Sequence, residues 1–230
     1  MITLYQYELS PFCNKVMLAL NFKNIDYELV NMTVSQHRSV RTYSDTSKLP
    51  CIQHKGQYIN DSTDIIYYLE EQFPTHKLIP KDPIIQDLCH VYEDWADESL
   101  NFYMMKLRWL PQNRRRWAKE LGKRDKGLIR LLVEKISHKA TLAILDKQGI
   151  GRKSLDQTIN DLHRHLKSIN TAVTESGYIV GDKISMADIS IYTQIYWIQK
   201  NPEGEIAIAK HDNLGKWMTK IKTLTLDTRI

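Results

Sequence analysis

The segment PTHKLIPKDP, residues 74–83, divides the chain into two unlike parts. It holds three prolines and no periodic spacing of apolar residues, and proline lacks the backbone N–H that helices and inner strands use. Before it, strand-like and helix-like stretches alternate, whereas the residues after it show the apolar spacing of helices. This division predicts a small mixed α/β domain over residues 1–76, a linker over 77–83 and an all-helical domain over 84–230.

The first part predicts the order β-α-β-α-β-β-α. Its strand-like stretches are rich in β-branched and aromatic residues, and its helix-like stretches repeat apolar residues at helical spacing. The predicted strands cover 2–7, 25–30, 51–54 and 57–60, the predicted helices begin at 11 and 62, and residues 35–44 are expected to form a short helix or a loop. In the second part we expect helices over about 84–110, 117–147 and 155–175, one from Ser185 onward, and a last one near 212–223.

The composition is that of an ordinary globular protein. The chain has 230 residues, 42% apolar and 26% charged, and no apolar run approaches the roughly 20 residues of a membrane helix. From Met1 the chain passes directly into a strand-like stretch, without the basic start and cleavage site of a secretory leader. Three scattered cysteines form neither a disulfide framework nor a zinc spacing. We therefore expect a cytoplasmic protein without a metal.

The formal charge of +5 is unevenly placed. Residues 114–130 carry eight lysines and arginines against Glu120 and Asp125. Such a run is typical of a solvated helix face, and it would also suit a basic wall beside an anionic ligand or a patch for an acidic partner. Trp117 alone is no stacking platform, so a nucleic-acid partner is not expected, and no membrane partner is expected either.

Ser10 stands directly before Pro11, at the start of the first predicted helix. Proline suits the first helical position, so Ser10 can cap the helix by accepting from the backbone N–H of Phe12 or Cys13. Its hydroxyl can still donate its own proton, and a helix N-terminus favours negative charge. Lowering a thiol pKa of about 8.5 by two units corresponds to about 2.7 kcal/mol. Ser10 is therefore a helix cap and also a candidate for activating a bound thiol.

Two further segments combine turn residues with polar side chains. Leu49-Pro50 precedes a strand, where either a cis-proline in a tight turn or an ordinary trans turn would fit. Asp61, Ser62 and Thr63 have the composition of a helix N-terminus. They either cap that helix alone or also hold a ligand, with backbone N–H groups and Ser62 binding a carboxylate and Asp61 binding an amine.

Four motifs together resemble the glutathione S-transferase superfamily over nearly the whole chain. LYQYELSPFCNKVMLAL is similar to the family's first strand and helix, and SKLPCI is similar to its cis-proline loop. NDSTDIIYYLE resembles its γ-glutamyl-binding turn, and GYIVGDKISMADISIY resembles its capping box in the helical domain, Ser185 to Asp188. The resemblance implies an α/β plus all-α protein, with a thioredoxin-like N-terminal domain followed by the family's helical C-terminal domain.

The resemblance also implies roles for individual residues. Ser10 would be catalytic, donating a hydrogen bond to the thiolate of glutathione, the cosubstrate. Leu49 would bind the cysteinyl part through its backbone, and Pro50 would be cis. The other implied glutathione contacts are Asp61 and Ser62 at the γ-glutamyl end, and Lys48 and His37 at the glycyl carboxylate.

The sequence departs from the family pattern near these residues. Asp61 is one methylene shorter than the common glutamate, and Ser47 and Asp45 stand where a glycine and a proline are frequent. Tyr5 falls where the tyrosine-type classes keep their catalytic hydroxyl, and in a serine-type member that tyrosine is usually structural.

The resemblance places a second substrate, a small electrophile, between the two domains. Candidate lining residues come from the helix before Pro111, and Arg108 with the basic stretch beyond it would favour an anionic electrophile. The candidates are Tyr103, Met104, Leu107 and Arg108.

Three functions stay open at this point. The first is a homodimeric, serine-type glutathione transferase that activates glutathione for attack on a small hydrophobic electrophile. The second is a non-catalytic binding or regulatory protein of the same fold, similar to the stringent starvation regulators of bacterial transcription. The third is a glutathione-dependent thiol reductase using Cys13, which would be the resolving cysteine of a glutaredoxin-like loop whose first position is Ser10.

Overall fold

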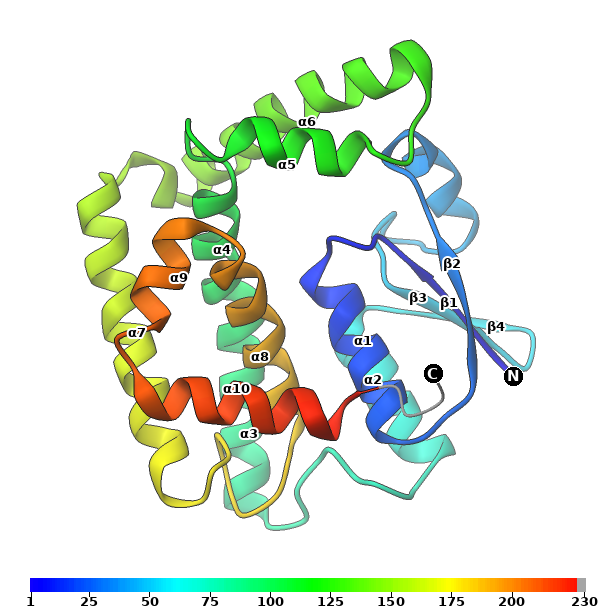
Figure 1. Ribbon diagram of the computed structural model, residues 1–230. Helices are drawn as coiled ribbons and strands as arrows, with labels where there is room; N and C mark the ends of the chain where they lie inside the picture. The colour runs from blue at the N-terminus through cyan, green and yellow to red at the C-terminus, as the bar shows by residue number, and fades with distance from the viewer. Residues whose placement is uncertain (227–230) are drawn as a thin grey trace.

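The computed structural model describes residues 1–226, with a small sheet on one side and a group of helices on the other (Figure 1). The sheet has the strand order β2-β1-β3-β4, in which β1 pairs parallel to β2 and antiparallel to β3, and β3 and β4 form the predicted hairpin. The elements of this part are β1 (Ile2–Gln6), α1 (Pro11–Phe22), β2 (Tyr27–Asn31), the 3₁₀ segment η1 (Val34–Thr42), β3 (Cys51–His54), β4 (Gln57–Asn60) and α2 (Ser62–Gln72).

Helices α1 and α2 form the middle layer, between the sheet and the other helices (Figure 1). Their apolar spacing gives each helix two buried faces. Val16, Leu20 and Ile65 pack against the buried residues of the strands, in a core beneath the sheet. Ala19 and Ile66 belong to the core of the helical part. The side chains that start these two helices therefore lie where the sheet and the helical part meet.

The helical part begins at α3 and is built around α8, whose residues are buried on nearly every side. A capping box starts α8, as predicted: the N–H and the hydroxyl of Ser185 each donate to Asp188 Oδ2 at 2.9 Å. The elements of this part are α3 (Pro83–Trp95), the π-helical segment η2 (Ala96–Leu100), α4 (Asn101–Arg108), α5 (Arg114–Gly122), α6 (Gly127–Gln148), the 3₁₀ turn η3 (Ile150–Arg152), α7 (Leu155–Glu175), α8 (Met186–Gln199), α9 (Pro202–Ile208) and α10 (Asp212–Leu224).

Two predicted helices are wrong in their continuity. The helix expected over 84–110 is interrupted by the π-helical segment η2, and the helix expected over 117–147 is two helices, α5 and α6, with a break between Gly122 and Gly127. Gly127 has a φ of +54°, in the left-handed region that favours glycine, so the chain turns there instead of continuing the helix. The short helix α9 was not predicted.

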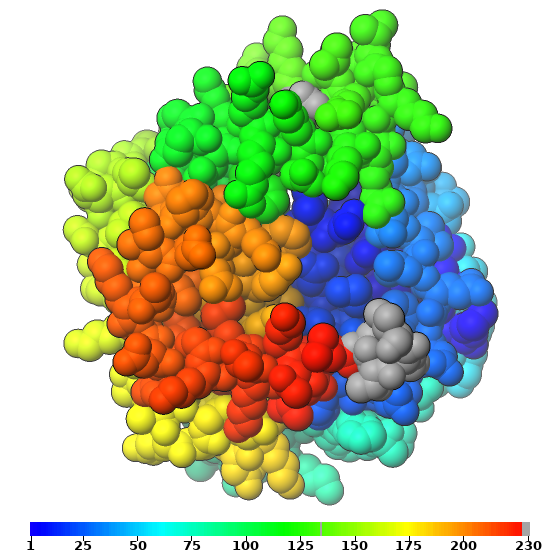
Figure 2. Space-filling model, in the orientation of Figure 1, coloured from blue at the N-terminus to red at the C-terminus, as the bar shows by residue number. Residues whose placement is uncertain are grey.

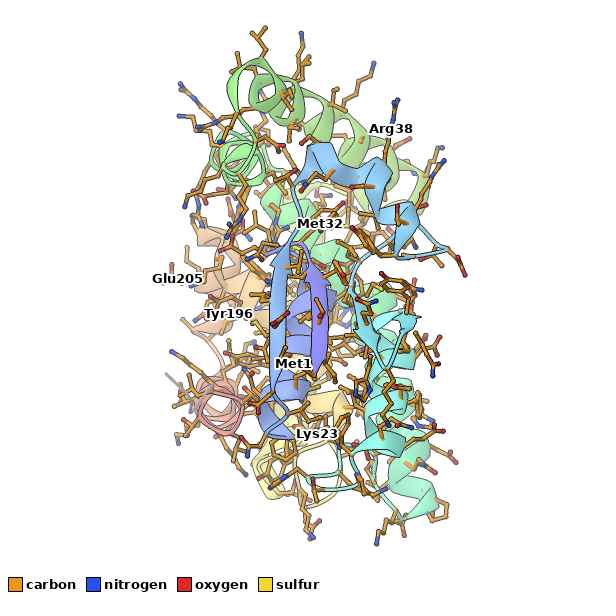
Figure 3. All side chains as sticks on the ribbon, turned by 90° about the vertical axis from the view of Figure 1, so that its right-hand side faces the viewer. Met1, Lys23, Met32, Arg38, Tyr196 and Glu205 are labelled. Carbon is orange, nitrogen blue, oxygen red and sulfur yellow. The ribbon has the colours of Figure 1, made fainter. Side chains whose placement is uncertain are left out.

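Specific hydrogen bonds connect the two parts. Trp197 of α8 donates through Nε1 to Asn14 Oδ1 of α1 at 2.6 Å. Near the lower end of α1 (Figure 3), the buried ammonium of Lys23 pairs with Glu70 at 2.8 Å, and Glu70 also accepts from the Leu78 N–H between α2 and α3. Leu78 in turn accepts from the N–H of Met186 at the start of α8, so this connecting segment is fixed to both parts.

Helices α5 and α6 extend from the helical part across to the N-terminal residues (Figure 2). Arg124, between the two helices, donates twice to Glu8 at 2.8 and 3.0 Å, and Ser35 of η1 donates to Asp125. These contacts close one side of the space above the start of α1. In the described part of the chain, no helix combines the length and apolar character that crossing a membrane would need.

Candidate active site: two pockets at the start of α1

One pocket lies beside the starts of α2 and η2 and has a volume of about 420 Å³; we call it the acidic pocket. It brings together five of the residues predicted to bind glutathione: Lys48, Leu49, Pro50, Asp61 and Ser62. Four acidic side chains from the helical part complete its lining: Glu93, Asp94, Asp97 and Glu98. A pocket with this lining can hold a ligand that carries both an ammonium group and carboxylates.

The peptide bond between Leu49 and Pro50 is cis, which decides between the two turns considered for this segment. Both residues are buried and line the acidic pocket, directly before β3. Ser47, three positions before Pro50, has a φ of +57°, in the region that favours glycine. Glycine, which the family often has at the position of Ser47, would adopt this backbone conformation without strain.

Asp61 caps α2 and has an unusual backbone. Its carboxylate accepts from the N–H of Thr63 at 2.8 Å, and its φ of +69° again lies in the left-handed region. Such strain often marks functional sites, because the surrounding structure must hold it in place. Ser62 follows on the first turn of α2, is 4% exposed and lines the acidic pocket. Because a hydroxyl and the N–H groups of a helix N-terminus both donate to anions, a carboxylate can bind here.

Behind this turn lies a buried ion network that the sequence did not predict. Lys15 of α1 is fully buried and pairs with Glu93 and, at 2.8 Å, with Asp97; it also donates to the Thr63 hydroxyl at 3.1 Å. Burial by itself lowers the pKa of Lys15, but the two carboxylates raise it overall. Burial also raises the pKa of Asp97, more than the ammonium of Lys15 lowers it. The network joins α1, α2, α3 and η2 along one wall of the acidic pocket.

Ser10 is the N-cap of α1, as predicted, and its Oγ accepts from the N–H of Cys13 at 3.4 Å. It lines a second pocket, while Phe12, two residues further on, lines both. The two pockets thus meet at Phe12, and Ser10 lies two residues before this junction, at the positive end of α1. A thiol bound at this junction would meet both the helix N-terminus and a hydroxyl donor.

Cys13 lies in the core below Ser10. Its side chain is 0% exposed, and its sulfur accepts from the N–H of Tyr7 at 3.3 Å. Burial raises the pKa of its thiol to about 11, although hydrogen bonds from Ser10 and from the Tyr7 N–H act in the opposite direction. A buried thiol that stays protonated is a poor nucleophile, so the environment of Cys13 does not support the thiol-reductase alternative.

Two other residues considered at the N-terminal domain lie outside both pockets. His37 is exposed in η1 and lines neither pocket. Tyr5 donates to Gln53 at 3.4 Å and stacks on Tyr43 with ring centroids 4.4 Å apart, which is a structural role.

The second pocket has a volume of about 320 Å³ and lies between the start of α1, the end of β2, and helices α4 to α6; we call it the apolar pocket. Met32, just beyond β2 (Figure 3), contributes to its lining. Its other large apolar side chains are Leu9, Phe12, Met104, Met105, Trp109 and Leu121. A pocket of this size and character would hold a small apolar molecule beside Ser10.

Of the four residues predicted to hold an electrophile, Met104 and Arg108 line the apolar pocket, and Tyr103 and Leu107 do not. Leu107 is 0% exposed in the helical core, and the Tyr103 hydroxyl lies 3.2 Å from His165 Nε2 of α7. The reason is helical geometry, since residues at positions i and i+4 share one face of α4 and their neighbours turn toward α7 and α8.

Tyr7 is a lining residue of the apolar pocket that sequence reasoning missed. Its hydroxyl is buried and has no hydrogen-bond partner within residues 1–226. Burial raises its pKa to about 12, and Cys13 and Asp125 add to this effect, so the hydroxyl keeps its proton and remains a donor. The sequence feature that could have indicated Tyr7 is its position at the end of the first strand, two residues beyond Tyr5.

Three comparisons with known proteins agree with this geometry. Residues 4–77 match the family model "Glutathione S-transferase, N-terminal domain", and residues 140–225 match "Glutathione S-transferase, C-terminal domain". Among curated relatives, glutathione S-transferase U8 of Arabidopsis thaliana is 30% identical over 123 residues, a match that spans 52% of this chain and about half (54%) of that relative. The maleylacetoacetate isomerase of Rattus norvegicus is 24% identical over 84% of this chain and 76% of its own length.

Among solved structures, a glutathione S-transferase of Methylobacillus flagellatus with glutathione bound superimposes with a TM-score of 0.65. It is 19% identical, and the superposition covers 96% of this chain and 95% of that one. At this identity the likeness shows the fold. The two family models and these matches together show that the chain belongs to the glutathione S-transferase superfamily.

The family uses glutathione, and no group of three or more potential metal ligands occurs among the residues that the structure describes.

Proposed function

We propose that this protein is a glutathione transferase, in which the acidic pocket binds glutathione and the apolar pocket binds a small electrophile. The observation that carries the proposal is that Ser10 lines the apolar pocket two residues before Phe12, which lines both pockets. Each charged group of glutathione finds a suitable partner in the acidic pocket. The start of α2 with Ser62 suits the γ-glutamyl carboxylate, the acidic wall suits the ammonium, and Lys48 suits the glycyl carboxylate.

The chemistry follows from the junction. With its charged ends held in this way, glutathione would extend its thiol past Pro50 toward the start of α1. The helix N-terminus and the Ser10 hydroxyl would then stabilise the thiolate, which attacks an electrophilic atom in the apolar pocket. The new carbon–sulfur bond forms as the leaving group departs with its electron pair. Ser10 already approaches Cys13, but an ionised sulfur accepts a stronger hydrogen bond than the Cys13 thiol does.

We also propose that the protein acts as a cytoplasmic homodimer. Three large apolar side chains lie exposed along α3, namely Ile84 (71%), Leu88 (42%) and Val91 (64%). A second copy that covers this helix would remove them from water.

Replacement of Ser10 by alanine tests the proposed mechanism. Because removing one donor from a developing or bound anion typically costs about 10²–10³ in rate, we expect Ser10→Ala to lose that much in kcat/KM with an aryl halide. Loss of the cap would also cost about 1 kcal/mol of stability. Ser10→Thr, which keeps a hydroxyl and a cap, is the control and should retain most of the activity. Equal turnover by Ser10→Ala and wild type would remove Ser10 from the mechanism.

The second candidate, a non-catalytic binding protein, is favoured by one observation. The first half of α6 exposes five large aliphatic side chains beside the basic residues of α5: Leu128, Ile129, Leu131, Leu132 and Ile136. Calorimetric titration with glutathione separates the two candidates, since a binding protein without glutathione chemistry would give no heat at millimolar glutathione.

A further inference from the structure

Arg108 is a buried cation without a counter-charge. Arg108 lines the apolar pocket and is 7% exposed. Within the described chain, its guanidinium makes one hydrogen bond, from Nη1 to the carbonyl of Leu9 at 3.2 Å. Its Cζ lies 4.6 Å from the ring centroid of Trp117 and 5.1 Å from that of Trp197. Nε and Nη2 are buried without a partner among residues 1–226.

The other charges at this pocket are balanced. Arg124 pairs with Glu8 at 2.8 Å, and Lys123 lies 3.6 Å from Glu120. The charged side chain that acts on the pKa of Arg108 is Arg116, which is another cation. Burial, followed by Arg116, lowers the pKa of Arg108 to about 9, so the guanidinium keeps its charge at neutral pH.

A buried charge is costly unless a partner compensates it, and here the chain provides only a backbone carbonyl and two aromatic faces. A missing partner could be supplied by a ligand in the pocket that Arg108 lines. We propose that the electrophilic substrate carries a carboxylate, and that Arg108 is the residue that selects it. The substrate class is thus an apolar molecule with one anionic group, held by the apolar lining and by the guanidinium.

The position of Arg108 also fits the chemistry, and this step rests on the proposed function. The carbonyl that accepts from Arg108 belongs to Leu9, which directly precedes Ser10. An anionic group attracted to the guanidinium would bring the rest of the substrate to the junction of the two pockets. The electrophilic atom would then lie near the sulfur that Ser10 stabilises.

The first test is an equilibrium measurement that needs no turnover. Dinitrobenzoate and dinitrobenzene have the same ring and lack a leaving group, and their binding can be followed by quenching of tryptophan fluorescence, with and without glutathione. We expect wild-type protein to bind the carboxylate at least about tenfold more tightly. Arg108→Met should abolish this preference, and Arg108→Lys should keep part of it because it keeps the charge.

Lys106→Met is the matched control. Lys106 is also a buried cation on α4, but its ammonium donates to the carbonyls of Ile150 and Lys153, and it does not line the pocket. This variant should keep the carboxylate preference of the wild type. Thermal unfolding of Arg108→Met adds a further readout: an unpaired buried charge replaced by an apolar side chain should leave the unfolding temperature unchanged or raise it.

Turnover of chlorodinitrobenzene and chlorodinitrobenzoate with glutathione then separates this proposal from the transferase proposal. A carboxylate preference in binding without turnover of either compound would support the anion site and contradict the transferase. Turnover of both compounds with equal KM, or a preference that survives in Arg108→Met, would overturn the anion site and leave the transferase standing. If Arg108→Met shifts the pH profile of both reactions equally without changing their ratio, Arg108 serves the thiolate and the proposal is wrong.

Discussion

The acidic and apolar pockets meet at Phe12, close to Ser10, and a buried cation lies beside each of them in a different setting. Behind the wall of the acidic pocket, the ammonium of Lys15 has two carboxylates and a hydroxyl as partners, supplied by α2, α3 and η2. In the apolar pocket the guanidinium of Arg108 has one backbone carbonyl and two indole rings. The first cation is satisfied by the fold and holds the wall of a pocket in shape, whereas the second is left for a ligand to satisfy.

Removal of the first cation should therefore have the largest effect on stability. Lys15→Met leaves Glu93 and Asp97 buried without their counter-charge, and breaking such a pair typically costs about 3–5 kcal/mol. We expect a loss of this size in urea unfolding, whereas Lys119→Met on the exposed face of α5 should change stability by less than about 0.5 kcal/mol. A loss below about 1 kcal/mol would mean that Lys15 is not balancing the two carboxylates.

The pH dependence of this variant sharpens the same point. Without Lys15 the pKa of Asp97, which burial already raises, rises further in the folded state, so the folded protein binds more protons than the unfolded chain at mildly acidic pH. The stability of Lys15→Met should then fall as the pH rises through this range, and acidification should recover part of the loss. A variant equally destabilised across the range would contradict the account of the network.

Ser62→Ala should affect the acidic pocket alone. A hydrogen bond to a charged group contributes about 1.5–3 kcal/mol, so we expect the KM for glutathione to rise about 10- to 100-fold. The KM for the electrophile should stay the same, because Ser62 does not line the apolar pocket. Asp64→Asn, on the exposed side of the same helical turn, is the control and should leave both constants unchanged. An equal rise in both constants would show that the pockets do not act separately.

The smallest expected effect concerns Cys13, whose thiol should not react with an alkylating reagent in the folded protein. Because burial raises the pKa of its thiol to about 11 and leaves it unexposed, iodoacetamide should not modify it in the native protein at pH 7.5. Mass spectrometry of native and urea-unfolded samples would compare the two states, and only the second should be labelled. Rapid labelling of native Cys13 would restore the thiol-reductase alternative.

The sequence predicted those parts of the fold that depend on local signals. Proline at the first helical position and serine before it placed the start of α1, and the serine–aspartate capping box placed the start of α8. In contrast, the break between α5 and α6 depends on the backbone of Gly127, and the π-helical segment has no local signature. Continuous helical spacing therefore hid both interruptions.

The candidate site was predictable where one segment supplies it and was missed where distant segments meet. Lys48 to Pro50 and Asp61 with Ser62 came from two short motifs, and the structure brings them together. The acidic wall was missed because Glu93 and Asp97 come from the helical part and lie beside these motifs only in the folded chain, where they pair with Lys15, some 80 residues earlier. The unpaired state of Arg108 likewise depends on which residues of α5 and α8 surround it, and they turned out to be tryptophans.

The most direct test of the account is the pKa of the glutathione thiol bound to the protein. The ultraviolet absorbance of the thiolate can be followed against pH in the wild type and in Ser10→Ala. With the thiol beside Ser10 and the start of α1, we expect a pKa about two units below that of a free thiol, and a return toward the free value in the variant. Absence of any protein-dependent thiolate signal at saturating glutathione, or an equal pKa in both proteins, would contradict the claim that glutathione binds with its thiol at Ser10.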